Sequence, residues 1–279
     1  MRSCPKCRTE LPDEARFCFQ CGAPQPEIAD PEDDTKIDWS EDAGPQIGSL
    51  FLGALRQRVQ TVYQMERYPD FSERLYESGF RDVVDRRSKL VGEKLNDQLN
   101  LGAISARKAN RLVEQLLQEL LDFFIIRHCG DLVELRLPEQ VLKYQQLSWG
   151  EFDLFQMVLD YLDFAHEDEI VYTDFLIMPV DKLRNAGKSF LFPEKQEKIL
   201  LICDQSILGS CKEGFALTEK AIYWKAHLQK ARQVAYAQIS RIAREKDWLN
   251  INSYFFNINP TLNFKMLHLL KKIALLQHL

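Results

Sequence analysis

Apolar residues recur at helical spacing from residue 49 to about residue 164. Ser49 is placed to cap a helix that ends before Pro69, and further helices are expected over residues 70–79, 80–102, 105–130 and 148–164. Apolar residues three and four positions apart line one face of a helix. The longest such stripe consists of Ala109, Leu112, Val113, Leu116, Leu117, Leu120 and Phe124. Because the connections are short, the pattern predicts an antiparallel helical bundle.

The pattern changes to short β-strands after about residue 198. Strands are expected at residues 199–202, 215–218, 221–225, 233–236, 240–243, 248–251 and 255–258. After Pro260 the period is helical again, and the apolar face of this last helix comprises Leu262, Met266, Leu269, Leu270, Ile273 and Leu276. Seven short strands followed by one helix predict a small curved sheet or β-barrel, plugged at one end by the helix.

Residues 24–46 have neither period. They contain eight acidic residues against Lys36 alone, four prolines, and only Ile28, Ile37 and Trp39 as large apolar residues. Such a segment cannot bury enough apolar surface to offset the entropy of ordering it, so a disordered acidic linker is expected. The chain is therefore predicted to be a multidomain α+β protein with four parts: residues 1–23, the linker 24–46, a mainly helical domain 47–180, and a β-rich domain 181–279.

The N-terminal part contains four of the seven cysteines, in two Cys-x-x-Cys pairs separated by ten residues: Cys4, Cys7, Cys18 and Cys21. Two such turns can present four thiolates in the tetrahedron that zinc prefers. A redox Cys-x-x-Cys is the alternative, but that chemistry uses one pair inside a βαβ domain. Four thiolates leave no open coordination position, so we expect one structural Zn²⁺ that supplies most of the folding free energy of this short segment.

The remaining cysteines, Cys129, Cys203 and Cys211, are flanked by apolar residues and are expected to be buried. An odd cysteine total argues against a disulfide scaffold. No apolar run approaches the about 20 residues that cross a bilayer, and the N-terminus lacks a secretory signal. We therefore expect a cytoplasmic location, with peripheral attachment to the inner face of the membrane as an alternative.

The net charge of −5 is unevenly distributed, because residues 195–279 contain thirteen Lys and Arg against six Asp and Glu. This basic end could contact an anionic membrane, where each basic residue contributes about 1 kcal/mol. The candidate contacts are Lys225, Lys230, Arg232, Arg241, Arg244 and Lys246. Alternatively, the acidic linker and the acidic middle of the chain neutralise this face internally. Nucleic acid is an unlikely partner, because the cysteine segment has almost balanced charges and a four-thiolate zinc centre adds about −2.

No catalytic constellation is evident. His128 and Cys129 are adjacent on a helix and point about 100° apart, so they do not form a nucleophile–base pair. The run Gly187-Lys188-Ser189 matches the last three residues of a phosphate-binding loop. The first glycine of that motif would stand five positions before Gly187, where this chain has Lys182. Residues 131–195 contain several acidic residues, but no motif places two of their carboxylates at a catalytic distance: Asp131, Glu134, Glu139, Asp153, Asp160, Asp163 and Asp174. A non-enzymatic protein is predicted, and an enzyme with an unrecognised site in residues 131–195 ranks last.

Two resemblances add to this interpretation. The pattern Cys-Pro-x-Cys … Phe-Cys-x-x-Cys-Gly over residues 3–23 resembles the short zinc ribbons at the N-termini of many prokaryotic multidomain proteins. The last third of the chain resembles bacterial pleckstrin-homology-like domains of the YokE type. The matching segments are residues 189–193, 208–210, 214–218, 222–225 and 236–240. The resemblances imply a structural zinc site and a pleckstrin-homology-like fold with no catalytic role.

The sequence thus favours a non-enzymatic adaptor, in which a zinc ribbon on an acidic linker and two folded domains gather protein partners. A peripheral membrane sensor that uses the basic C-terminal domain is the main alternative.

Overall fold

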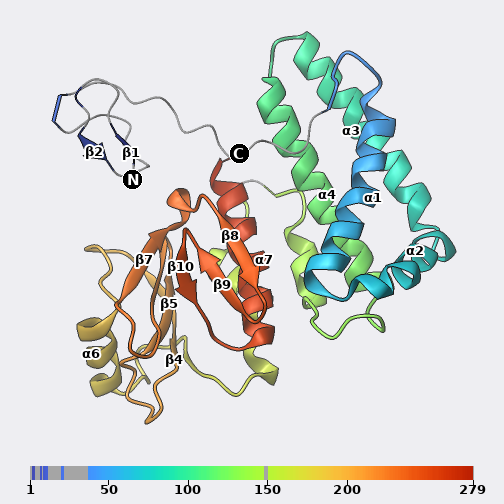
Figure 1. Ribbon diagram of the computed structural model, residues 1–279. Coiled ribbons are helices and arrows are strands. Elements are labelled where there is room, and N and C mark those ends of the chain that lie inside the picture. The colour runs from blue at the N-terminus through green and yellow to red at the C-terminus, as the bar shows by residue number, and fades with distance from the viewer. Residues whose placement is uncertain are drawn as a thin grey trace.

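A computed structural model of the chain describes residues 2–3, 7, 9–11, 20–21, 37–147 and 150–278. Figure 1 shows a helical bundle beside a mixed α+β unit, which we call the C-terminal unit. The bundle consists of α1 (Ala43–Val62), α2 (Tyr68–Glu77), α3 (Phe80–Asn100) and α4 (Ala106–His128). A short 3₁₀ turn, η1 (Met65–Arg67), joins α1 to α2. The predicted helical bundle is confirmed in these elements.

The longest predicted stripe is the buried face of α4. Ser105 caps this helix as expected, because its side chain accepts a hydrogen bond from the Lys108 backbone N–H at 3.2 Å. The aromatic centre of the bundle is Phe80, whose ring stacks on Phe123 and Phe124 at centroid distances of 5.7 and 5.4 Å. These contacts join the start of α3 to the last turns of α4.

The first helix begins earlier than the sequence pattern predicted. α1 starts at Ala43 rather than at Ser49, because the Asp42 carboxylate caps it through the Gly44 N–H at 2.9 Å. Ile37 is buried and Ala43 is completely enclosed. The structure therefore differs from the expected linker 24–46, since residues 37–46 already pack against the bundle. Small residues in the first turn of α1 let α3 approach closely, and the sequence pattern did not reveal this tertiary contact.

Two other helix starts differ from the prediction. α2 begins at Tyr68 with Pro69 in its first turn, where the missing N–H of proline is tolerated, rather than at residue 70. α5 (Leu154–Leu162) is capped by Asp153, whose carboxylate accepts from the Phe155 N–H at 2.8 Å. The expected start of this helix at residue 148 lies outside the described residues.

The C-terminal unit contains two antiparallel sheets. The larger has the order β3-β4-β5-β6-β7 and consists of β3 (Ile170–Tyr172), β4 (Ile199–Asp204), β5 (Gly214–Thr218), β6 (Ala221–Lys225) and β7 (Arg232–Ala235). The smaller has the order β10-β9-β8 and consists of β8 (Ile242–Glu245), β9 (Trp248–Ile251) and β10 (Tyr254–Phe256). The sequence pattern missed β3 and placed β8 two residues too early.

The predicted β-barrel is wrong. Over the described residues the strands form two separate sheets and no closed barrel. Residues 236–241, which include the 3₁₀ turn η4 (Tyr236–Gln238), connect β7 to β8, and each of these two strands is the edge of its own sheet. The final helix α7 (Pro260–His278) packs against η4, β8 and β9.

One apolar core joins both sheets to α7. Phe256 of β10 meets Phe215 and Trp224 edge-on at 5.7 and 5.8 Å, and Leu269 and Ile273 of α7 are completely buried in the same core. The predicted C-terminal amphipathic helix is thus confirmed. Its apolar face supplies the core that a closed barrel would otherwise have enclosed.

The segment before β3 belongs to this core as well. α5 packs against α7, and η2 (Glu139–Tyr144) packs against α5, so that Tyr144, Met157 and Leu162 are buried in the same core. This differs from the predicted boundary at residue 181. A periodic pattern shows that α5 has an apolar face, but only the packing shows which neighbour covers that face.

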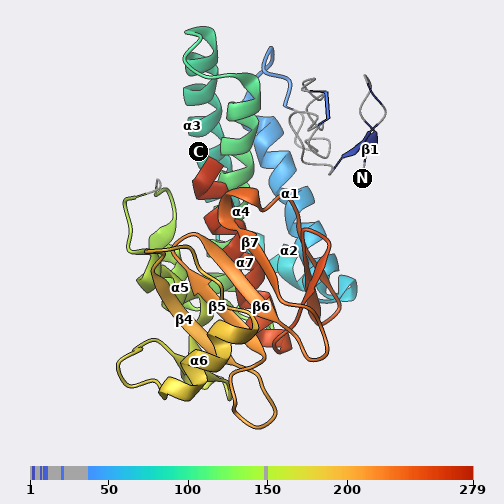
Figure 2. The same cartoon turned by 90° about the vertical axis from the view of Figure 1, so that its left-hand side faces the viewer.

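Charged residues connect the two bodies where α4 faces α7. Lys272 Nζ of α7 lies 2.9 Å from Glu119 Oε1 of α4. Within the bundle, Arg58 Nη1 of α1 lies 3.0 Å from Asp122 Oδ1 of α4. His268 Nδ1 lies 3.7 Å from the same Asp122 oxygen. In both views α7 lies beside α4, and α6 (Val180–Ser189) lies at the opposite end of the C-terminal unit from the end of α7 (Figure 2).

Candidate functional site

The described part of the cysteine segment begins with a small antiparallel ladder. β1 (Arg2–Ser3) pairs with β2 (Glu10–Leu11), so the first Cys-x-x-Cys pair lies in the loop between them. Cys7 is exposed and its Sγ lies 3.1 Å from Thr9 Oγ1, while Cys21 is half-buried. Cys4 and Cys18 lie outside the described residues. Two thiols in short turns fit a soft divalent cation such as Zn²⁺ as part of a four-sulfur donor set.

Residues elsewhere in the described part of the chain do not offer a second metal centre, since no group of three or more His, Cys, Asp or Glu is placed to hold an ion. The other cysteines are buried, as predicted: Cys129, Cys203 and Cys211. Burial raises the pKa of the Cys129 and Cys211 thiols to about 12. These thiols are protonated at neutral pH and serve as small apolar side chains.

Three of the six basic residues predicted to contact a membrane lie at one end of the larger sheet. Lys225 ends β6, Lys230 lies in the β6–β7 hairpin, and Arg232 begins β7 with its guanidinium 4.4 Å from the centroid of the Tyr254 ring. Lys225 Nζ also donates to Ser189 Oγ at 3.0 Å. The pairing register brings these residues together, which sequence spacing alone could not show.

The other three lie apart. Arg241 is exposed beside the β9–β10 turn, where its N–H donates to Asn252 Oδ1, and Lys246 is exposed in the β8–β9 turn. Arg244 has only 13 % of its side chain exposed and lies near Tyr63 and His268 at the junction with the bundle. Its Nε and Nη1 atoms are buried without a hydrogen-bond partner among the described residues. Arg244 is therefore unsuited to contact a membrane.

The same end of the larger sheet exposes several large aliphatic side chains. Asp204 of β4 pairs with Gly214, and Gly214 pairs with Lys225, so the β4–β5 and β6–β7 loops leave the sheet at one end. The start of α6 is adjacent, because Lys182 Nζ lies 4.0 Å from Asp204 Oδ2. We call the exposed aliphatic residues of these two loops and of the segment between β3 and α6 the apolar loop surface: Leu176 (96 % exposed), Ile177 (79 %), Ile207 (83 %), Leu208 (90 %) and Leu228 (88 %).

The apolar loop surface was missed from the sequence. The sequence pattern gives residues 208–210 only as a segment of a resemblance, and it does not predict α6. The available signal was a pair of large aliphatic residues two positions before Pro179 and another directly before Gly209, in segments that lack strand or helix period. Such pairs in loops are candidates for an interface, since a loop does not hide them in a core.

Three of the acids named in residues 131–195 have separate partners in the structure. Asp131 accepts two hydrogen bonds from the Arg74 guanidinium, at 2.8 and 2.9 Å, and these lower its pKa to about 2. Asp160 is hydrogen-bonded by Tyr144 and lies 2.6 Å from Lys143. Glu139 pairs with Arg127 on α4 at 2.6 Å. These carboxylates make separate ion pairs and hydrogen bonds.

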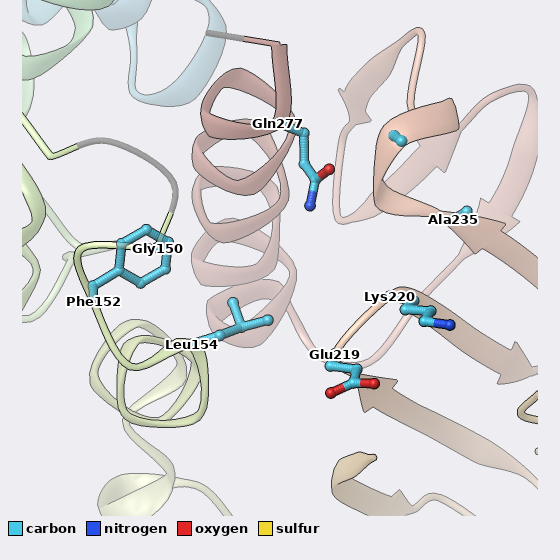
Figure 3. Close-up of a pocket in the computed structure, with 8 residues that line it drawn as sticks. Gly150, Phe152, Leu154, Glu219, Lys220, Ala235 and Gln277 are labelled. Atoms are coloured by element: carbon cyan, nitrogen blue, oxygen red, sulfur yellow. The ribbon is translucent and has the colours of Figure 1, made fainter. Parts of the chain in front are cut away.

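One cleft, with a volume of about 560 Å³, lies between the segment before α5, the β5–β6 turn and the end of α7. Its walls are mainly apolar: Phe152, Leu154, Ala235 and Ala237. Figure 3 shows Gln277 of α7 together with Glu219 and Lys220 of the turn at its polar rim. Lys220 Nζ forms an ion pair with Glu194 Oε2 at 3.1 Å. The residues that line this cleft therefore do not provide a free nucleophile–base pair.

Comparison with known proteins identifies one part of the chain. Residues 3–25 match the family model of the zinc-ribbon domain. Neither the curated proteins nor the solved structures yield a match to this chain. The N-terminal segment is therefore a zinc-ribbon domain, which implies that the chain binds zinc. The predicted likeness to pleckstrin-homology-like domains has no support in these comparisons. None of the described helices is long and apolar enough to span a membrane.

Proposed function

We propose that this chain is a non-enzymatic interaction protein, an adaptor that combines a structural zinc ribbon with a docking surface on the C-terminal unit. The observation that carries the proposal is the apolar loop surface. Monomeric proteins seldom leave adjacent large aliphatic side chains this exposed unless a partner covers them. Burying a leucine contributes about 1.5–3 kcal/mol, so even a few of these side chains could sustain binding.

The zinc ribbon adds a second element to the proposal. Cys4, Cys7, Cys18 and Cys21 would hold one Zn²⁺, and four thiolates leave no position for a substrate. The metal then has a structural role and fixes the shape of a small recognition module. The acidic linker sets how far this module reaches from the bundle.

The proposal is tested by capture of partners with the full chain. The triple variant Leu176→Ser/Leu208→Ser/Leu228→Ser should lose partners that the intact chain retains, because all three side chains belong to the apolar loop surface. A matched control is Leu90→Ser/Leu101→Ser, which changes two exposed leucines of the bundle. Identical partner sets for all three proteins would refute a docking role for the surface.

The contribution of the ribbon is measured with a chain that lacks residues 1–35. This truncation retains Ile37 and Trp39, which pack against the bundle, whereas removal of residues 1–46 would also delete the cap of α1. Partners lost only on truncation depend on the ribbon. If truncation changes nothing, the ribbon does not recruit partners.

A membrane surface is the second candidate, and the charge of the loops favours it. Residues 173–189, 205–213 and 226–232 contain six Lys and Arg against three Asp and Glu, in a chain with a net charge of −5. The full chain should then sediment with anionic vesicles at low salt and not with neutral vesicles. Lys212→Glu/Lys230→Glu should weaken this binding. Absence of sedimentation at low salt would remove this candidate.

An enzyme with its site in residues 131–195 remains the least supported alternative. The acids of that region already serve helix caps and ion pairs, as Asp131, Asp153 and Asp160 illustrate.

A further inference from the structure

Arg244 carries a buried positive charge at the junction between the bundle and the C-terminal unit. Its side chain is 13 % exposed, and its Nε and Nη1 atoms are buried without a hydrogen-bond partner among the described residues. Its Nη2 atom lies 4.0 Å from Asp247 Oδ1, which is too long for a hydrogen bond. Because a guanidinium stays protonated at physiological pH, Arg244 is a charge that no described acid neutralises at bonding distance.

The two acids that α4 contributes to this junction are already paired with other cations. Asp122 accepts a hydrogen bond from Arg58 Nη1 at 3.0 Å, and Glu119 accepts one from Lys272 Nζ at 2.9 Å. If Arg244 took either acid, another buried cation would lose its partner. The charge of Arg244 therefore has to be balanced by something other than these carboxylates.

The surroundings of Arg244 are positively charged. His268 of α7 is buried, and desolvation holds its pKa well below the usual value. The charges of Arg58, Lys271 and Arg244 lower this pKa further, so all three cations lie near an imidazole that is itself neutral at neutral pH. Coulomb interactions are strong in such a poorly solvated place, and a nearby negative charge is strongly favoured there.

One edge of the guanidinium is accessible from solvent. Asp247, the residue nearest to Nη2, has 76 % of its side chain exposed, so a small shift of this side chain makes room beside Arg244. A guanidinium presents five N–H donors in a planar fork, which suits the several acceptor oxygens of an oxyanion such as phosphate. An oxyanion that enters at Nη2 can accept hydrogen bonds from Nη2 and from one adjacent donor, Nε or Nη1.

From this arrangement we propose that Arg244 binds a small oxyanion of the phosphate class at the junction between the bundle and the C-terminal unit. The anion supplies the missing negative charge and accepts hydrogen bonds from the guanidinium. Because Arg58 belongs to the bundle and Arg244 to the C-terminal unit, both bodies attract the anion, and binding favours their joined arrangement. This inference does not depend on the apolar loop surface, so it can fail while the proposed function stands.

Thermal unfolding of the full chain in inorganic phosphate tests the proposal, with sodium chloride at equal ionic strength as the reference. A ligand that binds only the folded chain stabilises it, so phosphate at about ten times its Kd should raise the Tm of the intact chain by about 3–5 °C. Arg244→Met removes every donor and keeps a long side chain, so phosphate should not raise its Tm above the chloride reference. Isothermal titration calorimetry with inorganic phosphate should detect one site in the intact chain and none in Arg244→Met.

The order of stability separates a lost site from a damaged fold. Without an oxyanion, Arg244→Met should be at least as stable as the intact chain, because it removes a buried charge that lacks a partner. In saturating phosphate the intact chain should be the more stable of the two. The matched control is Arg241→Met, which changes an exposed arginine directly before β8 and should keep the full response to phosphate.

Sulfate should reproduce the effect of phosphate, since both ions present tetrahedrally arranged oxygens. An equal rise in Tm for the intact chain and Arg244→Met would overturn the proposal, because phosphate would then act as a general stabilising salt. No response of the intact chain to phosphate or sulfate would also overturn it, and water would then be the partner of these donors. A site that takes chloride as well as phosphate would contradict the oxyanion class.

Discussion

The contact between Glu119 and Lys272 allows a sharp test of how the bundle is joined to the C-terminal unit. Glu119 Oε1 lies 2.9 Å from Lys272 Nζ of α7, 2.9 Å from Gln115 Nε2 and 3.0 Å from the Gln146 backbone N–H. The Glu119 and Lys272 side chains are only 12 % and 9 % exposed. One carboxylate oxygen therefore connects α4, α7 and the segment after η2 in a poorly solvated place.

Lys272→Met removes the cation and keeps a side chain of similar length. Glu119 is left with two neutral donors and little water. Removing one partner of a buried ion pair costs about 3–5 kcal/mol, whereas replacing both partners by apolar residues is often neutral. We expect Lys272→Met to lower the free energy of unfolding by about 3 kcal/mol, and Glu119→Met/Lys272→Met to recover most of that loss.

Urea denaturation of the full chain, monitored by far-UV circular dichroism, measures these differences. Lys94→Met on the exposed side of α3 is the control and should change stability by less than about 0.5 kcal/mol. If Lys272→Met costs less than about 1 kcal/mol, the pair is well solvated in solution. If the double variant is less stable than Lys272→Met, the penalty does not come from the uncompensated Glu119 charge.

The remaining predictions concern the metal, the bundle and the response to acid. Elemental analysis should find one zinc per chain, and chelation should unfold residues 3–25 without changing the helical signal of the bundle; a metal-free chain with an unchanged ribbon would contradict this. Gly92→Ala should destabilise by about 1–3 kcal/mol in urea, because its Cβ would lie 2.9 Å from the Gly44 backbone nitrogen, whereas Gly53→Ala has nothing within 4 Å and should be neutral or stabilising. His268 is buried, and desolvation together with nearby cations holds its pKa well below the usual value. Its neutral form is therefore favoured in the fold, so stability should fall as pH drops below about 6.5, the value in the unfolded chain, and His268→Gln should show a shallower fall between pH 7 and 5. Equal slopes for the two proteins would exclude His268 as the cause.

Much of the bundle could be predicted because its helices are long and their apolar positions repeat every three to four residues. α3, α4 and α7 appear where the pattern placed them, and Ser105 caps α4 as its type suggests. The first residue of a helix was harder to predict. Asp42 and Ser49 are both residue types that cap helices, and the close packing of α3 against the first turn of α1 favours the start at Asp42. The zinc-ribbon segment was predictable because its cysteine spacing is itself the chemical requirement.

The sequence by itself determined which segments carry an apolar face, where the charges and cysteines lie, and that zinc is the appropriate metal. The tertiary structure decided which faces meet: α5 packs with α7, the two sheets remain separate, and Arg244 faces the bundle instead of solvent. The reason is physical. Periodicity reports the environment of a residue along its own helix or strand, whereas partners distant in the chain are selected by packing and by compensation of buried charge. Exposed side chains such as Leu176 and Leu208 acquire significance only when the fold leaves them uncovered.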